Sequence, residues 1–257
     1  MSGSVVLVHG VRSSRTMWRP QIKRLTKRGF HVVAPDLPGH GERQDEEFSL
    51  AAALATIDEA VASCPEPPML VGLSLGGYLS LQYAATTQRP LRAVTVAGCT
   101  AVPNRFLAVA FGAYLSWRDR LPGSADDSVL AAFAKANSPK AARHYYGGGR
   151  AKAHVVAPVM RALVRLDVLE AIGSIDVPVT IINGRRDEFR IHERRFLAAN
   201  DAARSASIER TQAAAIASSS PRPRRSSSRS RSVSSGARRT GSPTRSTTSC
   251  TRPPRTR

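Results

Sequence analysis

Ser74 is the residue best placed to do chemistry, because it lies at the centre of a G-x-S-x-G motif with Gly72 and Gly76. An apolar run at 68–70 precedes the motif and a helix-like segment at 78–83 follows it. A strand, a sharp turn and a helix in this order lift a serine hydroxyl clear of a sheet, where it can attack an acyl carbon. Glycine is needed on both sides because only a hydrogen side chain clears the neighbouring backbone. The motif therefore predicts nucleophilic acyl transfer.

The motif is surrounded by alternating strands and helices. Short apolar runs with helical spacers are typical of right-handed β–α–β units, and they indicate a parallel sheet covered by helices on both faces. Such a sheet collects functional side chains at the carboxyl ends of its strands. The predicted strands lie near 4–8, 31–35, 68–73, 92–97 and 177–183, with a last strand beginning at 205–210, and the predicted helices lie near 19–28, 48–63, 76–86 and 191–203.

Four motifs at the ends of predicted strands resemble the α/β-hydrolase fold family. They are His9-Gly10, P-D-L-P-G-H-G at 35–41, the G-x-S-x-G motif, and N-G-x-x-D at 183–187. The similarity covers roughly residues 4–210 and begins at the family's third strand. It implies an α/β fold of the α/β-hydrolase type, with a mostly parallel sheet, helices on both faces and an inserted helical cap that roofs the active site.

The resemblance also implies a set of catalytic residues. Ser74 would be the nucleophile, and Asp187, just past the family's seventh strand, would orient the base. The oxyanion hole would be formed by the backbone N–H groups of Leu75, directly after the nucleophile, and of Val11, in the loop after His-Gly. A solvated aspartate between Arg186 and Glu188 is the alternative for Asp187. His9 and Asp36 would hold the loops rather than do chemistry, as indicated by their positions after the first two strands.

The base is missing from its expected place, a histidine on a loop after the last strand. Only His192 follows Asp187, and it lies in the predicted first turn of a helix, which is the wrong position. His144 and His154 fall in the predicted cap, where we expect solvated or structural roles. The sequence therefore lacks the third member of the triad.

The chain is expected to have four parts, of which the second is the cap. Helical patterns in the cap at 106–111, 129–133 and 155–164 are interrupted by Pro-Gly and triple-Gly segments. Its aromatic residues Phe106, Phe111, Trp117, Tyr145 and Tyr146 are expected to form ordinary cap core, with an acyl pocket as the alternative. The four parts are 1–100, the N-terminal part of the core; 101–170, the helical cap insertion; 171–210, the C-terminal part of the core; and 211–257, a Ser/Arg-rich tail.

The tail departs from the family and from folded proteins in general. Its 47 residues include 13 Ser and 11 Arg, with no Asp, Glu, Lys, Leu, Met or aromatic residue, so nothing in it can form a core and we predict disorder. Its 11 arginines account for much of the net charge of +19, and the first 210 residues carry the remaining +8. The Arg/Ser run at 226–232 resembles RNA-binding repeats, so nucleic-acid binding is expected, if at all, only through this tail.

A change of reading frame explains both the tail and the missing histidine. In a GC-rich gene the wrong frame encodes mainly Arg, Ser, Pro, Ala, Thr and Gly, which is the composition of 211–257. If the codons of 213–216 are read from each third base, the genetic code permits Gly-Gly-His, which resembles the family's catalytic-histidine motif. The nucleotide sequence of codons 205–220 tests this hypothesis.

Composition indicates a soluble cytoplasmic protein, and the family resemblance implies a small-molecule acyl substrate as its partner. No apolar run is long enough to cross a membrane and no signal peptide is expected. The three cysteines are widely spaced and lack metal-site spacing, so neither disulfides nor a metal is expected, and nothing near Ser74 indicates an organic cofactor.

These features predict a serine hydrolase that acts on a small ester, thioester or related acyl compound through an acyl-enzyme. The missing histidine predicts impaired turnover. A C–C bond hydrolase and a cofactor-free perhydrolase share the same framework and stay open. A function of a different class is the alternative: the chain is then a non-catalytic member of the fold that binds a ligand or partner.

Overall fold

The computed structural model of the chain describes residues 3–120, 138–184, 187 and 190–200. The helix predicted at 129–133, the strand predicted at 205–210 and the tail at 211–257 lie outside these residues. The predictions for those three segments therefore stay predictions.

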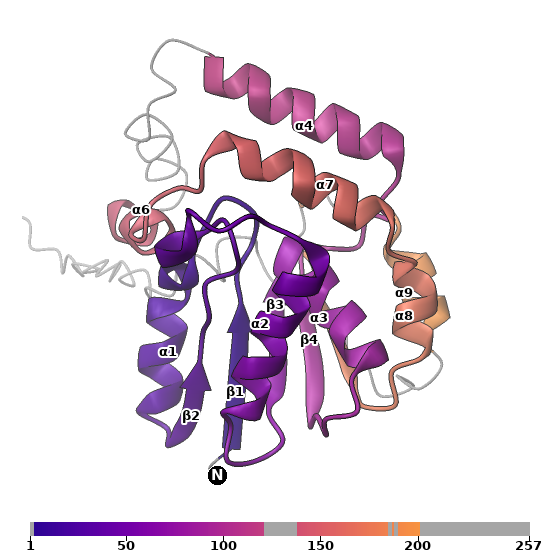
Figure 1. Cartoon of the computed structure of the whole chain (residues 1–257). Helices are drawn as coiled ribbons and strands as arrows, with labels where there is room; N and C mark the ends of the chain where they lie inside the picture. Colours follow the sequence, from indigo (N-terminus) through magenta and orange to yellow (C-terminus); the bar gives the residue numbers. More distant parts are fainter. Residues whose placement is uncertain (1–2, 121–137, 185–186, 188–189, 201–257) are drawn as a thin grey trace, which may run out of the picture. The chain divides into compact units, whose positions relative to one another are not determined.

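A five-stranded parallel sheet forms the centre of the described fold (Figure 1). The strand order is β2-β1-β3-β4-β5. The chain therefore places β2 on one side of β1 and then crosses over to add β3, β4 and β5 on the other side. All five predicted strands are confirmed with small shifts at their ends. They are β1 (Gly3–Val8), β2 (Phe30–Val33), β3 (Met69–Leu73), β4 (Ala93–Ala97) and β5 (Val179–Ile182).

Helices cover both faces of the sheet because successive strand side chains point to opposite sides. Val6 and Val8 of β1 belong to the larger core, which also includes residues of α2, α3 and α8. Val5 and Leu7 belong to a second cluster, packed with residues of α1. The helices are α1 (Arg19–Thr26), α2 (Leu50–Ala62), α3 (Leu75–Thr86), α8 (Val168–Gly173) and α9 (Glu193–Ala199).

A group of helices lies between β4 and β5 in the sequence, within the range predicted for the cap. In Figure 1, α4 and α7 cross the end of the sheet toward which the strands point, and the two helices pack on each other. Their position brings apolar side chains over the ends of the strands. The elements of this group are α4 (Arg105–Arg120), α6 (Pro139–Tyr146), the short turn η3 (Ala153–Val155) and α7 (Val156–Val164).

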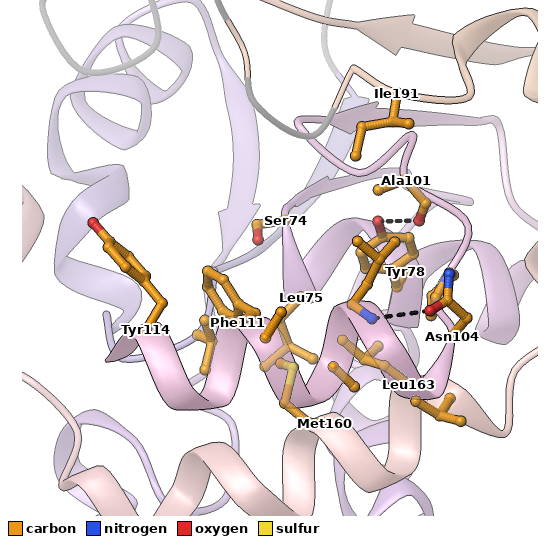
Figure 2. Close-up of a pocket in the computed structure, with 16 residues that line it drawn as sticks. Ser74, Leu75, Tyr78, Ala101, Asn104, Phe111, Tyr114, Met160, Leu163 and Ile191 are labelled. Atoms are coloured by element: carbon orange, nitrogen blue, oxygen red, sulfur yellow. Dashed lines mark hydrogen bonds between the residues drawn. The ribbon is translucent and has the colours of Figure 1, made fainter. Parts of the chain in front are cut away.

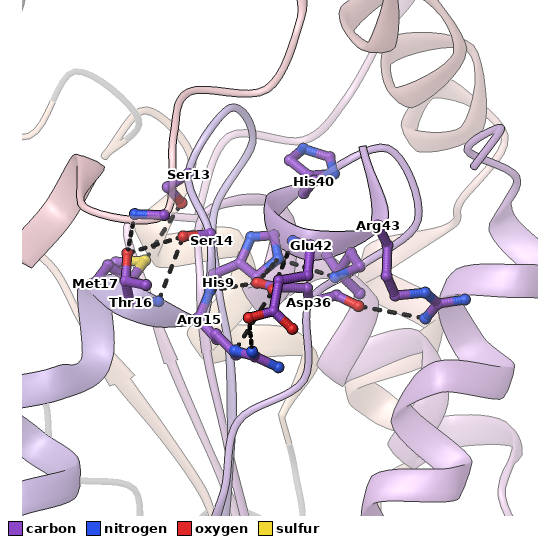
Figure 3. Close-up of polar contacts among 12 residues, drawn as sticks. His9, Ser13, Ser14, Arg15, Thr16, Met17, Asp36, His40, Glu42 and Arg43 are labelled. Carbon is purple, nitrogen blue, oxygen red and sulfur yellow. Dashed lines mark hydrogen bonds and ion pairs between the residues drawn. The ribbon is translucent and has the colours of Figure 1, made fainter. Parts of the chain in front are cut away.

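The loops after β1 and β2 are joined by buried polar contacts (Figure 3). The Asp36 carboxylate accepts hydrogen bonds from the backbone N–H groups of Arg15, at 2.7 Å, and Glu42, at 3.0 Å. The backbone N–H of Leu37 donates to Nε2 of His9 at 3.0 Å. Asp36 and His9 therefore have the structural roles expected from the sequence, and they fix the loop that follows His9.

Candidate active site

Ser74 occupies the sharp turn between β3 and α3, as the sequence predicts. Its φ of 51° and ψ of −115° lie in a region that side-chain-bearing residues rarely adopt. The conformation is held by its N–H, which donates to the carbonyl of Ala97 at 2.8 Å, and by its own carbonyl, which accepts from Gly77 at 2.9 Å. The surrounding backbone thus fixes the strained turn that presents the hydroxyl.

The elbow glycines allow the turn to pack directly against neighbouring backbone. A Cβ on Gly76 would overlap the carbonyl groups of Val8 and His9, and a Cβ on Gly72 would overlap the carbonyl of Gly76. Both obstacles are backbone atoms, which cannot rotate away as a side chain can. The start of α3 therefore lies as close to β1 as a hydrogen side chain permits.

We expect Gly76→Ala to lower the free energy of unfolding by about 3 kcal/mol or more, because the methyl group forces backbone displacement. Gly112→Ala is the matched control, since nothing lies within 4 Å of a Cβ there and Gly112 is inside α4. This control should be neutral or stabilising by roughly 0.5–1 kcal/mol. Urea unfolding of both variants checks this, and a Gly76→Ala protein as stable as the parent would contradict it.

The two residues predicted to donate to the oxyanion, Leu75 and Val11, both lie near Ser74. Leu75 is the first residue of α3, so its N–H has no acceptor within the helix. Val11 lines both of the cavities that contain Ser74. Gly10 precedes Val11, and a Cβ on Gly10 would lie 3.6 Å from Cβ of Ser74. The loop after β1 therefore comes close to the nucleophile, as an oxyanion hole requires.

The first cavity at Ser74, here called the acyl chamber, is mainly apolar and has a volume of about 300 Å³ (Figure 2). Helices α4 and α7 contribute half of its lining residues, and the start of α3 contributes Leu75 and Tyr78. The Tyr78 hydroxyl donates to the carbonyl of Ala101 at 2.6 Å, which leaves its ring to face the chamber. Further side chains that line it are Leu107, Phe111, Met160, Leu163, Val164 and Ile191.

The second cavity at Ser74, here called the polar chamber, has a volume of about 390 Å³ and contains Asp187. Oδ2 of Asp187 would lie 3.2 Å from a Cβ on Gly98, a residue with a φ of 59° at the end of β4. The carboxyl ends of β3, β4 and β5 thus bring Ser74 and Asp187 to the same edge of the sheet, as predicted. The polar chamber is also lined by Arg12, Arg150, Tyr145 and Tyr146.

No histidine of the described residues lines either chamber. His192 caps the start of α9, where its N–H donates to the carbonyl of Thr100 at 2.9 Å and its Nδ1 accepts from the N–H of Val102 at 3.0 Å. His144 lies on α6, where burial and the charge of nearby Lys140 lower its pKa, and His154 is exposed. The structure therefore gives His192 a structural role.

His9 and His40 form a buried, neutral pair behind the loop that carries Val11. Their ring centroids are 5.1 Å apart. Nδ1 of His9 bonds to the Gly10 carbonyl at 2.9 Å while Nε2 accepts from Leu37, which is the pattern of a neutral ring. Burial, and then the charge of His40, lower the pKa of His9 to about 3, and burial lowers the pKa of His40.

We expect acid to destabilise the fold through this pair. In the unfolded chain His9 titrates near its ordinary pKa, so below pH 6.5 the unfolded state binds a proton that the folded state does not. Between pH 6.5 and 4.5, His9 should lower the free energy of unfolding by about 1.4 kcal/mol per pH unit. Above that window its contribution is constant.

Urea unfolding at several pH values checks this expectation. His9→Gln keeps an acceptor for the Leu37 N–H but has no titrating group, so its slope with pH should be shallower by about 1.4 kcal/mol per unit. His31→Gln, the same substitution at an exposed position, is the control for effects of the replacement that do not depend on burial. An unchanged slope in His9→Gln would show that His9 is already protonated in the folded state.

Sequence reasoning located the nucleophile but missed most of the lining residues. The expectation of ordinary cap core is wrong for Phe106 and Trp117, which are 79% and 57% exposed. Phe111 instead lines both chambers, and Tyr145 and Tyr146 line the polar one. The sequence indicated helices at 106–111 and 155–164, but not which of their side chains would be buried or would surround Ser74.

Within the described part of the chain, no group of His, Cys, Asp or Glu side chains has the arrangement of a metal site. The free thiols Cys64 and Cys99 are half-buried and buried, and burial raises the pKa of both. None of the described helices is both long and apolar enough to cross a membrane.

Comparison with known proteins agrees with the geometry. A model of the "Alpha/beta hydrolase family" matches residues 5–221. The chain is 28% identical over 200 residues to a pimeloyl-[acyl-carrier protein] methyl ester esterase of Xanthomonas campestris, covering 72% of this chain and 76% of that protein. Similar solved structures include the enol-lactonase from Burkholderia xenovorans LB400, with a TM-score of 0.65, 19% identity and coverage of 84% and 85% of the two chains. Another is the thioesterase domain from the curacin biosynthetic pathway, with a TM-score of 0.59, 20% identity and coverage of 82% and 84%.

Proposed function

Because the chain belongs to the alpha/beta hydrolase family, we propose that its site is that of a serine hydrolase for small esters, thioesters or related acyl compounds. The observation that carries the proposal is Ser74 on its strained turn, opening into the two chambers with Asp187 in one of them. An ordinary surface serine needs neither the unfavourable backbone nor the glycines packed against it.

In the proposed reaction, Oγ of Ser74 bonds to the acyl carbon and the bond to the leaving oxygen or sulfur breaks. The hydroxyl proton passes through a base to the leaving group, so that an alcohol or thiol departs. Water then attacks the acyl-enzyme, which releases the acid and returns the proton to Ser74. The N–H groups of Leu75 and Val11 would bind the oxyanion in both steps, and Asp187 would orient the base.

The proposed hydrolase reaction is impaired in this chain, because no base lies beside Ser74 in the described part of the site. His192 lines neither of the two chambers that Ser74 lines. Its backbone N–H and its imidazole are instead hydrogen-bonded to Thr100 and Val102. A serine hydroxyl is a weak nucleophile at neutral pH unless a base takes its proton. Without a triad base, roughly 10³–10⁴-fold acceleration over water remains from binding and the oxyanion hole.

The apolar wall of the acyl chamber favours a hydrocarbon acyl group. Met160 and Leu163 of α7 and Phe111 of α4 offer it no charged partner. The similar protein from Xanthomonas is a methyl ester esterase, and one structural relative is a thioesterase domain, so esters and thioesters are the substrate classes to test first.

Hydrolysis of p-nitrophenyl acetate and butyrate tests the proposal. We expect little or no turnover by the 257-residue chain, and any turnover should disappear in Ser74→Ala. Turnover that survives in Ser74→Ala would exclude Ser74 as the nucleophile.

The alternative is a non-catalytic protein that uses the same chambers to bind a ligand. His192 favours it, since the imidazole of this histidine accepts a hydrogen bond from the backbone N–H of Val102 and lines neither chamber of Ser74. An active-site phosphonate separates the two functions, because efficient labelling requires an activated serine. A chain that binds esters but never labels at Ser74, even with a histidine restored, would be a binding protein.

A further inference from the structure

The outward side of α4 is apolar and exposed. Phe106, Val109 and Trp117 are 79%, 71% and 57% exposed. Together with Ala113, which is also exposed, they recur every three or four residues and therefore share one side of the helix. The opposite side includes Leu115, which is buried. A surface helix normally turns polar side chains to water, so this second apolar side, here called the outer face of α4, indicates a surface that binds a partner.

The outer face of α4 adjoins the acyl chamber. Tyr114 is 46% exposed, its ring centroid lies 6.4 Å from that of Trp117, and it also lines the chamber. Ile191 is 55% exposed and lines the chamber as well. Among the described residues, these two and the three large side chains of the outer face are the exposed large hydrophobic ones. The exposed apolar surface is therefore gathered on α4 and beside the chamber that contains Ser74.

The predicted cap, to which α4 belongs, is cationic. Its range, 101–170, contains ten Lys and Arg residues and five Asp and Glu residues. Arg105 is exposed directly before Phe106, and Arg161 and Arg165 are exposed near the end of α7, the helix that packs on α4. A second copy of the chain would bring the same positive charge toward this face, which opposes self-association. Charge complementarity favours an anionic partner instead.

The shape of this surface favours a lipid bilayer over an acidic protein. In Figure 1, α4 lies outermost, with α7 between it and the strands, so the outer face projects from the molecule. Projecting Phe and Trp side chains next to arginine are typical of a helix that lies in a membrane interface, where the aromatic groups enter the boundary of the acyl region and the cations stay with the phosphates. Such docking needs no membrane-spanning helix.

We propose that the outer face of α4 binds the protein to the surface of an anionic lipid bilayer. Phe106, Val109 and Trp117 enter the boundary between headgroups and acyl chains, and Arg105 interacts with the lipid phosphates. Tyr114 then places the acyl chamber next to the lipid. The inference goes beyond the proposed function and does not depend on it, because docking requires neither a nucleophile nor a base.

Tryptophan fluorescence of the full chain tests the docking. The chain has two tryptophans, and Trp18 is 3% exposed in the second core cluster, so Trp117 is the one that lipid can reach. Vesicles of equal parts phosphatidylcholine and phosphatidylglycerol, with a spin-labelled phosphatidylcholine as quencher, should shift its emission to the blue and quench it. Vesicles without phosphatidylglycerol should bind at least roughly tenfold more weakly. Trp117→Phe should still float with the anionic vesicles but should lose the quenching.

Matched variants of the full chain separate the outer face from the tail at 211–257, whose 11 arginines also attract anionic lipid. Phe106→Ser keeps every charge and should weaken binding to the anionic vesicles about tenfold. Arg105→Gln should weaken it about fivefold, whereas Lys27→Gln, at the exposed end of α1, should leave it unchanged. Circular dichroism checks that each variant is folded.

Three results would overturn the inference. Binding without quenching of Trp117, or binding unchanged in Phe106→Ser, would attribute the association to the tail. A concentration-dependent dimer in analytical ultracentrifugation that Phe106→Ser abolishes would show that a second copy covers the face. Failure to bind the anionic vesicles at all would exclude lipid and leave an acidic protein as the class of partner.

Discussion

Consider a chain in which the reading frame at codons 213–216 is shifted to begin at the third base of each codon, so that the new codons encode Gly-Gly-His. This re-coded chain should hydrolyse p-nitrophenyl acetate at least roughly 10³-fold faster than the 257-residue chain. Restored histidine would take the proton of Ser74 as the acyl bond forms and return it to the leaving group. Asp187 already lines the chamber where that imidazole would be needed. Initial rates at saturating ester, with both proteins at equal folded concentration, measure the gain.

The matched control is the re-coded chain with that single histidine replaced by glutamine. It keeps the new C-terminal sequence and should fall back to the rate of the 257-residue chain. A gain that survives the replacement would show that the new sequence acts through stability and not through proton transfer. If the 257-residue chain already turns over at ordinary enzymatic rates, and Ser74→Ala abolishes this, a base exists elsewhere.

Ser74→Ala in the re-coded chain should lower kcat by roughly 10⁴-fold or more, because nucleophile and base act as a unit. The variant removes one oxygen and should fold as its parent does. Ser80→Ala, in the helix that follows Ser74, is the control: Ser80 is buried, its Oγ has no hydrogen-bond partner among the described residues, and its loss should not affect the rate. Retention of most activity in Ser74→Ala would exclude the acyl-enzyme.

The sheet could be predicted from the sequence because its strands are short apolar runs whose ends carry family motifs. The elbow was equally accessible, since Gly72 and Gly76 are required by backbone contacts that only hydrogen can satisfy. Asp187 could be assigned to the edge near Ser74 because parallel strands end together. These features depend on local pattern and on strand direction alone.

The two chambers could not be predicted in the same way. Their walls combine side chains from the loop after β1, α4 and α7, and periodicity identifies a sheltered face without identifying what it shelters. The contact between Arg12 and the carbonyl of Ala151 joins segments far apart in the sequence, and no motif predicts it. The hydrogen bond that His192 Nδ1 accepts depends on the position of Val102, which is likewise a property of the assembled fold.

The most direct test of the central claim is the rate of phosphonate labelling, followed by mass spectrometry of the modified peptide. We expect a single adduct, on Ser74, that forms slowly in the 257-residue chain and much faster in the chain with Gly-Gly-His. An adduct on another residue, or equally fast labelling of Ser74 in both chains, would contradict it.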